Sequence, residues 1–188
     1  MRKFECWLHN LKSIYYILNM KNWLLSILAI IILLTQCSKE KINVSIIYPT
    51  DNLGNLIGST PNDNQWKNVN FSGSELALFS ELDTANLSGT QLPTISNSSY
   101  GYPNPFASYI SVHTSLTQPL NGEIVVKYVV VDNKMKSVEK GSTRIYITSS
   151  INFMVSSNFS SGKYRLYFTY SAEGHKHFFK SWGNIQKM

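Results

Sequence analysis

The stretch that decides the fold class is Lys163-Tyr164-Arg165-Leu166-Tyr167-Phe168-Thr169-Tyr170, which follows the turn Ser160-Ser161-Gly162. In a β-strand, successive side chains point to opposite faces of the sheet. Every second residue here is a large apolar or aromatic one, so we predict a strand whose core-facing side chains are Tyr164, Leu166, Phe168 and Tyr170. The other face carries two charged residues, Lys163 and Arg165, together with Tyr167 and Thr169.

Stretches of the same kind recur through the C-terminal half of the chain, with turn-forming residues between them. The predicted strands are Phe106–Ser115, Glu123–Val131, Thr143–Thr148, Asn152–Val155 and His175–Trp182. Several short strands with turns at regular spacing are typical of an antiparallel β-sandwich. We therefore predict an all-β fold, with the sandwich spanning residues 98–188.

Residues 42–97 are less regular and are expected to pack on the sandwich. In chain order they predict a strand at Asn43–Tyr48, a turn-rich loop at 50–64, an alternating stretch at Gln65–Phe71 and one or two helical turns at Ser74–Ser80. Ser72 or Ser74 would cap the helical turns. Thr84–Tyr100 is polar and predicts a loop long enough to mark a boundary before the sandwich.

The apolar run that ends at Cys37 is a candidate targeting signal. Residues 23–34 are almost all apolar, with Lys21 before them and polar residues after the cysteine. A membrane span needs roughly 20 apolar residues, so this run fits the core of an export signal better. The pattern Leu34-Thr35-Gln36-Cys37 resembles a loose Bacteroidetes-type lipobox, which implies that Cys37 becomes the acylated N-terminus. The alternatives are an uncleaved short anchor and a buried core helix.

This signal divides the chain into parts. We predict a signal peptide with a signal helix at 1–36, a lipidated tether at 37–41, the irregular part at 42–97 and the sandwich at 98–188. Met20-Lys21-Asn22-Trp23 is itself a well-formed signal opening. One hypothesis therefore places the true translation start at Met20, and the alternative treats residues 1–19 as a long basic leader.

Charge and cysteine content narrow the function classes. Residues 1–36 hold four of the 17 basic residues and one of the 11 acidic residues, so the mature net charge is +3 rather than +6. That is too weak for a nucleic-acid partner, which needs a basic stripe. The two cysteines are Cys6, within the signal, and Cys37, so the mature fold would hold no disulfide, free thiol or cysteine metal site.

A proline-rich motif opens the predicted sandwich. Tyr102-Pro103-Asn104-Pro105-Phe106 precedes Tyr109-Ile110-Ser111-Val112, and later come Val129-Val130-Val131-Asp132-Asn133 and Ser161-Gly162-Lys163-Tyr164. Over Ser98–Phe179 these motifs resemble the C-terminal sorting domains of the type IX secretion system in Bacteroidetes and related bacterial immunoglobulin-like domains. The resemblance implies an immunoglobulin-like sandwich.

Two roles are open for the segment Tyr102, Pro103, Asn104, Pro105 and Phe106. It can be a stiff structural start to a strand, because each proline fixes its own φ and keeps the preceding residue extended. It can also be a sorting signal read by a receptor, as the resemblance implies. A lipid anchor would already supply one address, so we favour the structural role.

Candidate metal ligands are sparse. His175 and His177 would project from one face of a strand and could bind Zn²⁺ with Glu173 as a third ligand. Asp51 and Asp63 could hold Ca²⁺, but their spacing suits a site of clustered oxygen ligands poorly. We interpret all of them as exposed strand and turn residues, and predict no metal and no cofactor.

Recognisable catalytic motifs do not occur in the sequence. It contains no Gly-x-Ser-x-Gly elbow, phosphate-binding loop or His-Glu-x-x-His pair. A nucleophile triad could combine one of the many serines with His113, His175 or His177, but no spacing supports it. We predict no catalytic residues and no enzymatic activity, and keep a small hydrolase as the weakest alternative.

Aromatic side chains are the richer signal. The chain has more rings than one small core usually hides, among them Trp66, Trp182, Tyr100, Tyr102, Tyr128, Tyr146, Tyr167 and Tyr170. Rings exposed on a sandwich face could stack on a glycan or a protein partner, and the alternative is that they pack in the core.

Together these features predict a lipoprotein of the cell envelope, held by acyl chains on Cys37 at the outer membrane, on its periplasmic face or at the cell surface. We expect it to be a non-enzymatic binding or structural module. The alternative is a client or component of cell-surface protein secretion.

Replacing Cys37 tests the anchor. Cys37→Ser should move the protein from the membrane fraction to the soluble fraction, because the buried acyl chains, at about 0.8 kcal/mol per CH₂, are lost. Immunoblots of fractionated cells measure this, and unchanged partitioning would contradict the lipoprotein prediction.

Overall fold

The computed structural model describes residues 41–188, apart from 60–61, 83–92, 119–121, 148, 157 and 173. The predictions on the signal peptide, on Met20 and on Cys37 fall within residues 1–40 and so lie outside the described residues.

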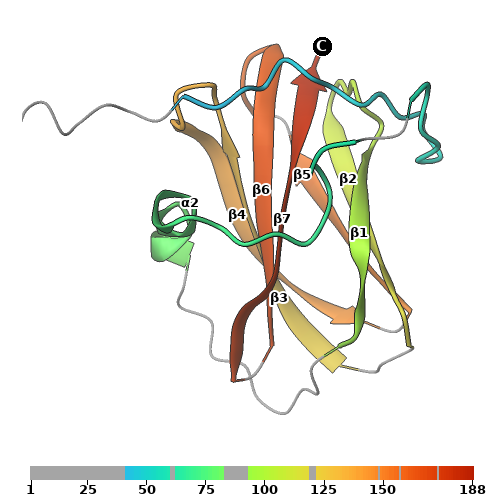
Figure 1. The fold of residues 1–188 in the computed structure, drawn as a ribbon, viewed down its shortest axis with the longest axis vertical. Helices are drawn as coiled ribbons and strands as arrows, with labels where there is room; N and C mark the ends of the chain where they lie inside the picture. The colour runs from blue at the N-terminus through green and yellow to red at the C-terminus, as the bar shows by residue number, and fades with distance from the viewer. Residues whose placement is uncertain are drawn as a thin grey trace, which may run out of the picture. The chain divides into compact units, whose positions relative to one another are not determined.

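The described chain is built from two antiparallel sheets (Figure 1). The strands are β1 (Ile95–Tyr102), β2 (Tyr109–Leu116), β3 (Gly122–Val131), β4 (Ser137–Ile147), β5 (Ser150–Ser156), β6 (Gly162–Ala172) and β7 (His175–Lys187). One sheet has the order β1-β2-β5 and the other β4-β3-β6-β7. Two short helices, α2 (Gly73–Ala77) and η1 (Ser80–Leu82), precede them.

This topology confirms the predicted all-β, immunoglobulin-like sandwich. β3, β6 and β7 form the sheet opposite β1, β2 and β5, as in immunoglobulin-like domains, and β4 extends the first of these sheets at its β3 edge. Each pairing within the two sheets is antiparallel.

The main core lies between the two sheets. The predicted inward face of β6 is confirmed, since all four of its residues belong to this core: Tyr164, Leu166, Phe168 and Tyr170. β5 supplies the facing layer, and the rings of Phe153 and Phe168 have centroids 5.5 Å apart. Burying these large side chains contributes about 1.5–3 kcal/mol each.

A second apolar cluster covers the outer face of the four-stranded sheet. Tyr167 of β6 packs edge-on against Phe71, 5.3 Å between centroids, and Phe71 stacks on Phe79. Val129 and Val131 of β3 belong to the same cluster. The face of β6 that includes Lys163 and Arg165 is therefore also partly buried, under residues 42–82.

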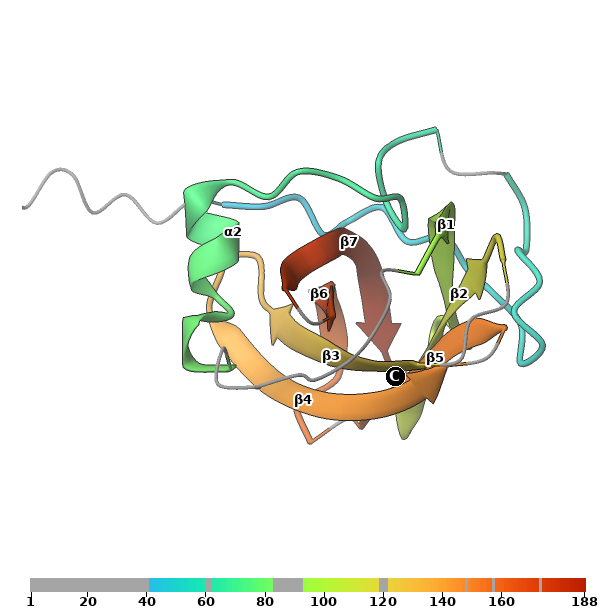
Figure 2. The ribbon, with the colours of Figure 1, turned by 90° about the horizontal axis from the view of Figure 1, so that it is seen from below.

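These N-terminal residues cross the strands of the four-stranded sheet from the β4 side toward β1, and then return to α2 on the β4 side (Figures 1 and 2). The outward run starts where the N–H of Ile42 donates to the carbonyl of Asn133 and ends where Thr50 pairs with Asn104. The return run passes Trp66 and reaches α2. We call residues 41–82 the N-terminal cover.

Trp66 joins the cover to both sheets. Its N–H donates to the carbonyl of Trp182 on β7 at 2.6 Å, and its carbonyl accepts from the N–H of Ser99 on β1 at 2.7 Å. Its indole lies over Gly183 of β7, where an added Cβ would be 2.1 Å from the ring, and against Gly101 of β1, where the distance would be 2.5 Å. The indole therefore fills the seam between β1 and β7.

The predicted strand at Asn43–Tyr48 is wrong. Residues 41–49, all of them described, form no strand. Their carbonyls are taken by side chains instead of a ladder: Asn43 accepts from Arg165 Nη2 at 2.6 Å, and Ile46 accepts from Asn184 Nδ2 at 3.0 Å.

The predicted loop Thr84–Tyr100 is also wrong at its C-terminal end, because β1 already begins at Ile95. The inward-facing positions of β1 hold Ser99 and Gly101, which leave room for Trp66 and so show no apolar alternation. Residues 83–92 lie outside the described part of the chain.

The predicted helical turns at Ser74–Ser80 are confirmed. Ser72 is the N-cap: its Oγ accepts from the N–H of Glu75, whose carboxylate accepts from the N–H of Ser72 at 2.8 Å. This capping box satisfies two otherwise unpaired donors of the helix.

Gly183→Ala should destabilise the protein by about 1–3 kcal/mol, because its new methyl group would overlap the buried indole of Trp66. Urea denaturation followed by circular dichroism measures the free energy of unfolding. Gly73→Ala is the matched control: nothing lies near its Cβ position and it sits in α2, so it should stabilise slightly. Equal stability of Gly183→Ala and wild type would show that the indole does not need this gap.

Candidate functional site

The proline-rich motif lies between β1 and β2. Both of its prolyl peptide bonds, Tyr102-Pro103 and Asn104-Pro105, are cis. Asn104 is 0% exposed and connects three parts of the chain. Its Nδ2 donates to the carbonyls of Asn184 (3.1 Å) and Tyr48 (3.4 Å), and its Oδ1 accepts from the N–H of Gln186 (3.0 Å).

The rest of the motif is also part of the sandwich. Phe106 is fully buried in the main core, and its backbone pairs with Gln186 and Met188 beside the end of β7. The motif thus ties the N-terminal cover to β7, which supports its structural role. Whether a receptor also reads this segment stays a prediction.

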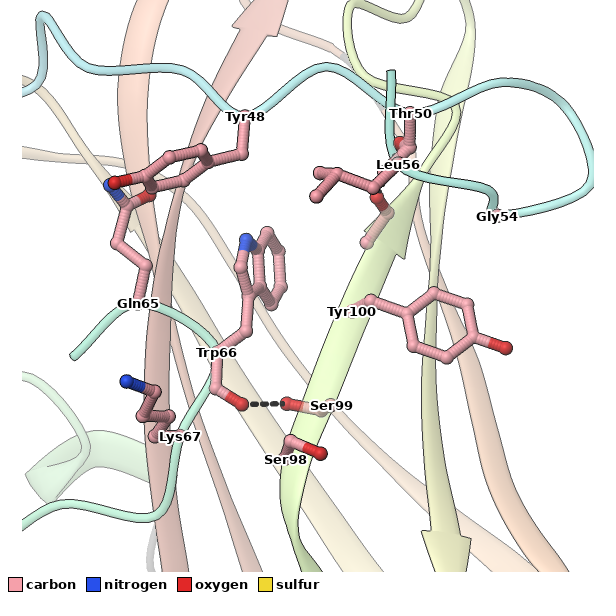
Figure 3. A pocket seen from close by; sticks show the side chains of 11 residues that line it. Tyr48, Thr50, Gly54, Leu56, Gln65, Trp66, Lys67, Ser98, Ser99 and Tyr100 are labelled. Atoms are coloured by element: carbon pink, nitrogen blue, oxygen red, sulfur yellow. Dashed lines mark hydrogen bonds between the residues drawn. The ribbon is translucent and has the colours of Figure 1, made fainter. Parts of the chain in front are cut away.

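A pocket of about 280 Å³ opens where the N-terminal cover meets β1 (Figure 3). Its apolar walls are the side chains of Tyr48, Leu56, Trp66 and Tyr100, and its rim carries Ser98 and Lys67. The volume is at the small end of the range for ligand pockets, about 300–1,000 Å³, and fits one ring-sized group.

Two features of Trp66 are unusual. Its φ is +62°, a left-handed backbone conformation that bulky residues rarely adopt and that costs on the order of 1–3 kcal/mol. Its side chain lines the pocket although the residue is only 6% exposed. Its indole Nε1 has no hydrogen-bond acceptor among the described residues, and it is not buried from solvent. This N–H is therefore available to donate to a ligand.

Tyr100 connects the pocket to the outer face of the β1-β2-β5 sheet. Its ring lines the pocket and also contacts Tyr102 (5.6 Å between centroids) and His113 of β2 (5.0 Å). Burial, with a smaller contribution from the neighbouring Tyr102, raises the pKa of Tyr100, so the hydroxyl is a neutral donor at physiological pH.

Next to these rings, polar side chains form a hydrogen-bonded network across the sheet. His113 Nδ1 lies 2.6 Å from Asn152 Oδ1, and its Nε2 lies 3.2 Å from Ser115 Oγ. Asn152 Nδ2 donates to Ser150 Oγ at 2.9 Å. We call Tyr100, Tyr102, His113, Ser115 and Asn152 the open face.

The strands of the open face contain no acidic residue and no Lys or Arg. β1, β2 and β5 contain no Asp, Glu, Lys or Arg, whereas β4 and β7 carry several. Exposed apolar groups flank the network: Tyr109 is 51% and Met154 66% exposed. The outer face of the other sheet is covered by residues 42–82, so the two faces of the sandwich differ sharply.

Ser115, His113 and Asn152 have the connectivity of a nucleophile, a base and an orienting group. Acyl transfer also needs N–H donors for the oxyanion. β2 pairs with both β1 and β5, so its backbone N–H groups are engaged in the two ladders. β2 itself therefore offers no backbone N–H for an oxyanion.

The aromatic residues singled out from the sequence fall into two groups. Trp66, Tyr167 and Tyr170 are buried, Tyr128 is partly buried against the main core, and Trp182 lies 3.9 Å beneath the guanidinium of Arg165. Tyr100, Tyr102 and Tyr146 reach the surface to different extents, and Tyr146 stands alone on β4 at 69% exposure.

The candidate metal ligands do not come together. Among the described residues, no group of three potential ligands is close enough to hold a metal ion. The backbone N–H of His177 donates to Ser171 Oγ, and its ring contacts Phe79. The carboxylate of Asp51 accepts from two backbone N–H groups of its own turn, and that of Asp63 accepts from Gln65.

Neither a protein-family model nor a curated protein matches this sequence. Part of a glycosyl hydrolase family 2 member from Bacteroides cellulosilyticus resembles 50% of this chain at 11% identity and a TM-score of 0.31, over 14% of its own length. A CARDB domain from Pyrococcus furiosus matches 64% of this chain and 100% of its own, at 8% identity and 0.33. A Niemann-Pick type C2 protein from the Japanese carpenter ant matches 55% and 98%, at 6% identity and 0.31.

At such low TM-scores these likenesses say nothing about function.

Among the described residues, no helix combines the length and apolarity needed to cross a membrane.

Asn104→Ala should destabilise the protein by about 2–4 kcal/mol, because each buried group left unpaired costs about 1–3 kcal/mol. Thermal and urea unfolding measure this. Asn70→Ala, at an exposed position of the N-terminal cover, is the control and should change stability by less than about 0.5 kcal/mol. A fully stable Asn104→Ala protein that fails to reach the cell surface would instead favour the sorting role.

Proposed function

We propose that this protein is an exported, lipid-anchored lipoprotein of the cell envelope that acts as a non-enzymatic binding module. The observation that carries the proposal is the asymmetry of the sandwich. One sheet is covered by the protein's own N-terminal residues, while the other presents a polar and aromatic face without Asp, Glu, Lys or Arg beside a pocket.

The anchor is part of the same proposal. Acyl chains on Cys37 would hold the protein at the outer membrane, and residues 37–41 would tether the sandwich to it. The weak positive charge of the mature chain and the absence of charge on β1, β2 and β5 support a neutral ligand over nucleic acid.

A role as client or component of surface secretion is the alternative. It rests on the resemblance of the motif Tyr102–Phe106 to sorting domains. The burial of Asn104 and Phe106 favours the binding module, because these side chains already serve the fold.

Tyr100→Ala should reduce retention of envelope components by the full-length protein, since this ring lines both the pocket and the open face. Quantitative affinity capture from detergent-solubilised envelopes measures retention. Tyr146→Ala, which removes a more exposed ring from the opposite sheet, is the matched control and should behave as wild type. Equal retention by both variants would contradict the proposed binding surface.

A further inference from the structure

We infer that the ligand is a neutral oligosaccharide, with one sugar ring in the pocket against Trp66 and the chain continuing over Tyr100 and Tyr102. This inference rests on the proposed function and specifies its ligand. It follows from three properties of the described residues: a pocket with an available indole donor, an aromatic strip leading out of it, and three strands that contain no Asp, Glu, Lys or Arg.

The pocket fits one face of a sugar ring. A pyranose has an apolar face of C–H groups and hydroxyls around its edge, so it packs on aromatic rings and accepts hydrogen bonds at its rim. Tyr48, Leu56 and Trp66 provide apolar walls, and the indole N–H of Trp66 provides a donor that has no partner among the described residues (Figure 3). Because solvent reaches this N–H, it is free to donate to a ligand hydroxyl oxygen in place of water.

The aromatic strip follows β1 away from the pocket. Tyr100 and Tyr102 are two residues apart and so lie on the same face of the strand, with their rings in contact. A larger hollow of about 440 Å³ follows at Tyr102, Pro103 and Tyr109, with Asn52 on its rim. From Ser98 to Tyr102 the strip runs roughly 13 Å along the strand, at about 3.3 Å per residue, which is long enough for more than one sugar ring.

The polar network supplies the edge contacts. His113, Asn152 and Ser115 hold one another in place, so they are preorganised to exchange hydrogen bonds with hydroxyls. The three strands carry no Asp, Glu, Lys or Arg, so beyond Lys67 on the pocket rim a uronic acid or sulfated chain would gain no charge partner along the strip.

A protein partner fits these observations less well. Stable protein interfaces bury about 800 Å² per partner around a well-packed apolar centre. Here the exposed large side chains, Tyr109 and Met154, flank a flat band of serine, asparagine and histidine. A network of small hydroxyl and amide groups matches the hydroxyl-rich edge of a sugar chain more closely.

The full-length protein in detergent micelles should bind short neutral cello-, xylo- or manno-oligosaccharides in isothermal titration calorimetry, and oligogalacturonate no more tightly, because Lys67 is the one cation at the pocket rim among the described residues. Tyr100→Ala should weaken neutral binding about three- to tenfold, the effect of losing one stacked ring. Tyr146→Ala should leave it unchanged. In ¹H–¹⁵N spectra, the indole N–H resonance that disappears in Trp66→Phe should shift when the sugar binds.

The outcomes separate this inference from the proposed function. If none of the neutral sugars binds, while Tyr100→Ala still abolishes capture of an envelope protein, the sugar inference is overturned and the binding module stands. If sugars bind equally to wild type and Tyr100→Ala and the Trp66 resonance does not move, the site is overturned. If Tyr100→Ala changes neither sugar binding nor envelope capture, both fail.

Discussion

The placement of one indole over a glycine is the constraint on which this structure depends. Gly183 leaves β7 without a side chain at the point where Trp66 crosses it, and Gly101 leaves the same room on β1. Because the gap is available, Trp66 can close the seam between the sheets while its backbone bonds to β7 on one side and β1 on the other. The left-handed backbone of Trp66 costs free energy, and the burial of its indole, the largest of the natural side chains, offsets that cost.

That contact fixes which surface of the sandwich is available. With Trp66 in the seam, the chain before and after it runs over the four-stranded sheet and buries Tyr167, Val129 and Val131. The three-stranded sheet has no such cover among the described residues, and its uncharged side chains remain accessible. The pocket forms where the covered and open regions meet, so the element that completes the fold also builds the wall of the site.

The sequence predicts the sandwich well and the cover poorly. Alternation at Lys163–Tyr170 predicts the correct inward face of β6, since that pattern reflects burial directly. The cover is missed because its carbonyls bond to side chains such as Arg165 and Asn184, which leaves no periodic pattern. A usable signal was present in β3: Ile124-Val125-Val126 and Val129-Val130-Val131 do not alternate, which is typical of a strand buried on both faces. The open face could not be predicted from the sequence. Its residues come from three separate strands, so no single sequence motif contains them.

The large sequence separation between the N-terminal cover and the strand that holds it constrains the order of folding. Asn184 of β7 donates to the carbonyls of Asn43 and Ile46, so the first described residues are held by the last strand. Contacts this far apart in sequence form late, because closing the intervening loop costs entropy before the contacts reward it. During synthesis from the N-terminus, Phe71 and Phe79 therefore cannot reach their packing partners until β3 and β6 have been made. The hydrogen bonds that hold the start of the cover form only once β7 is complete.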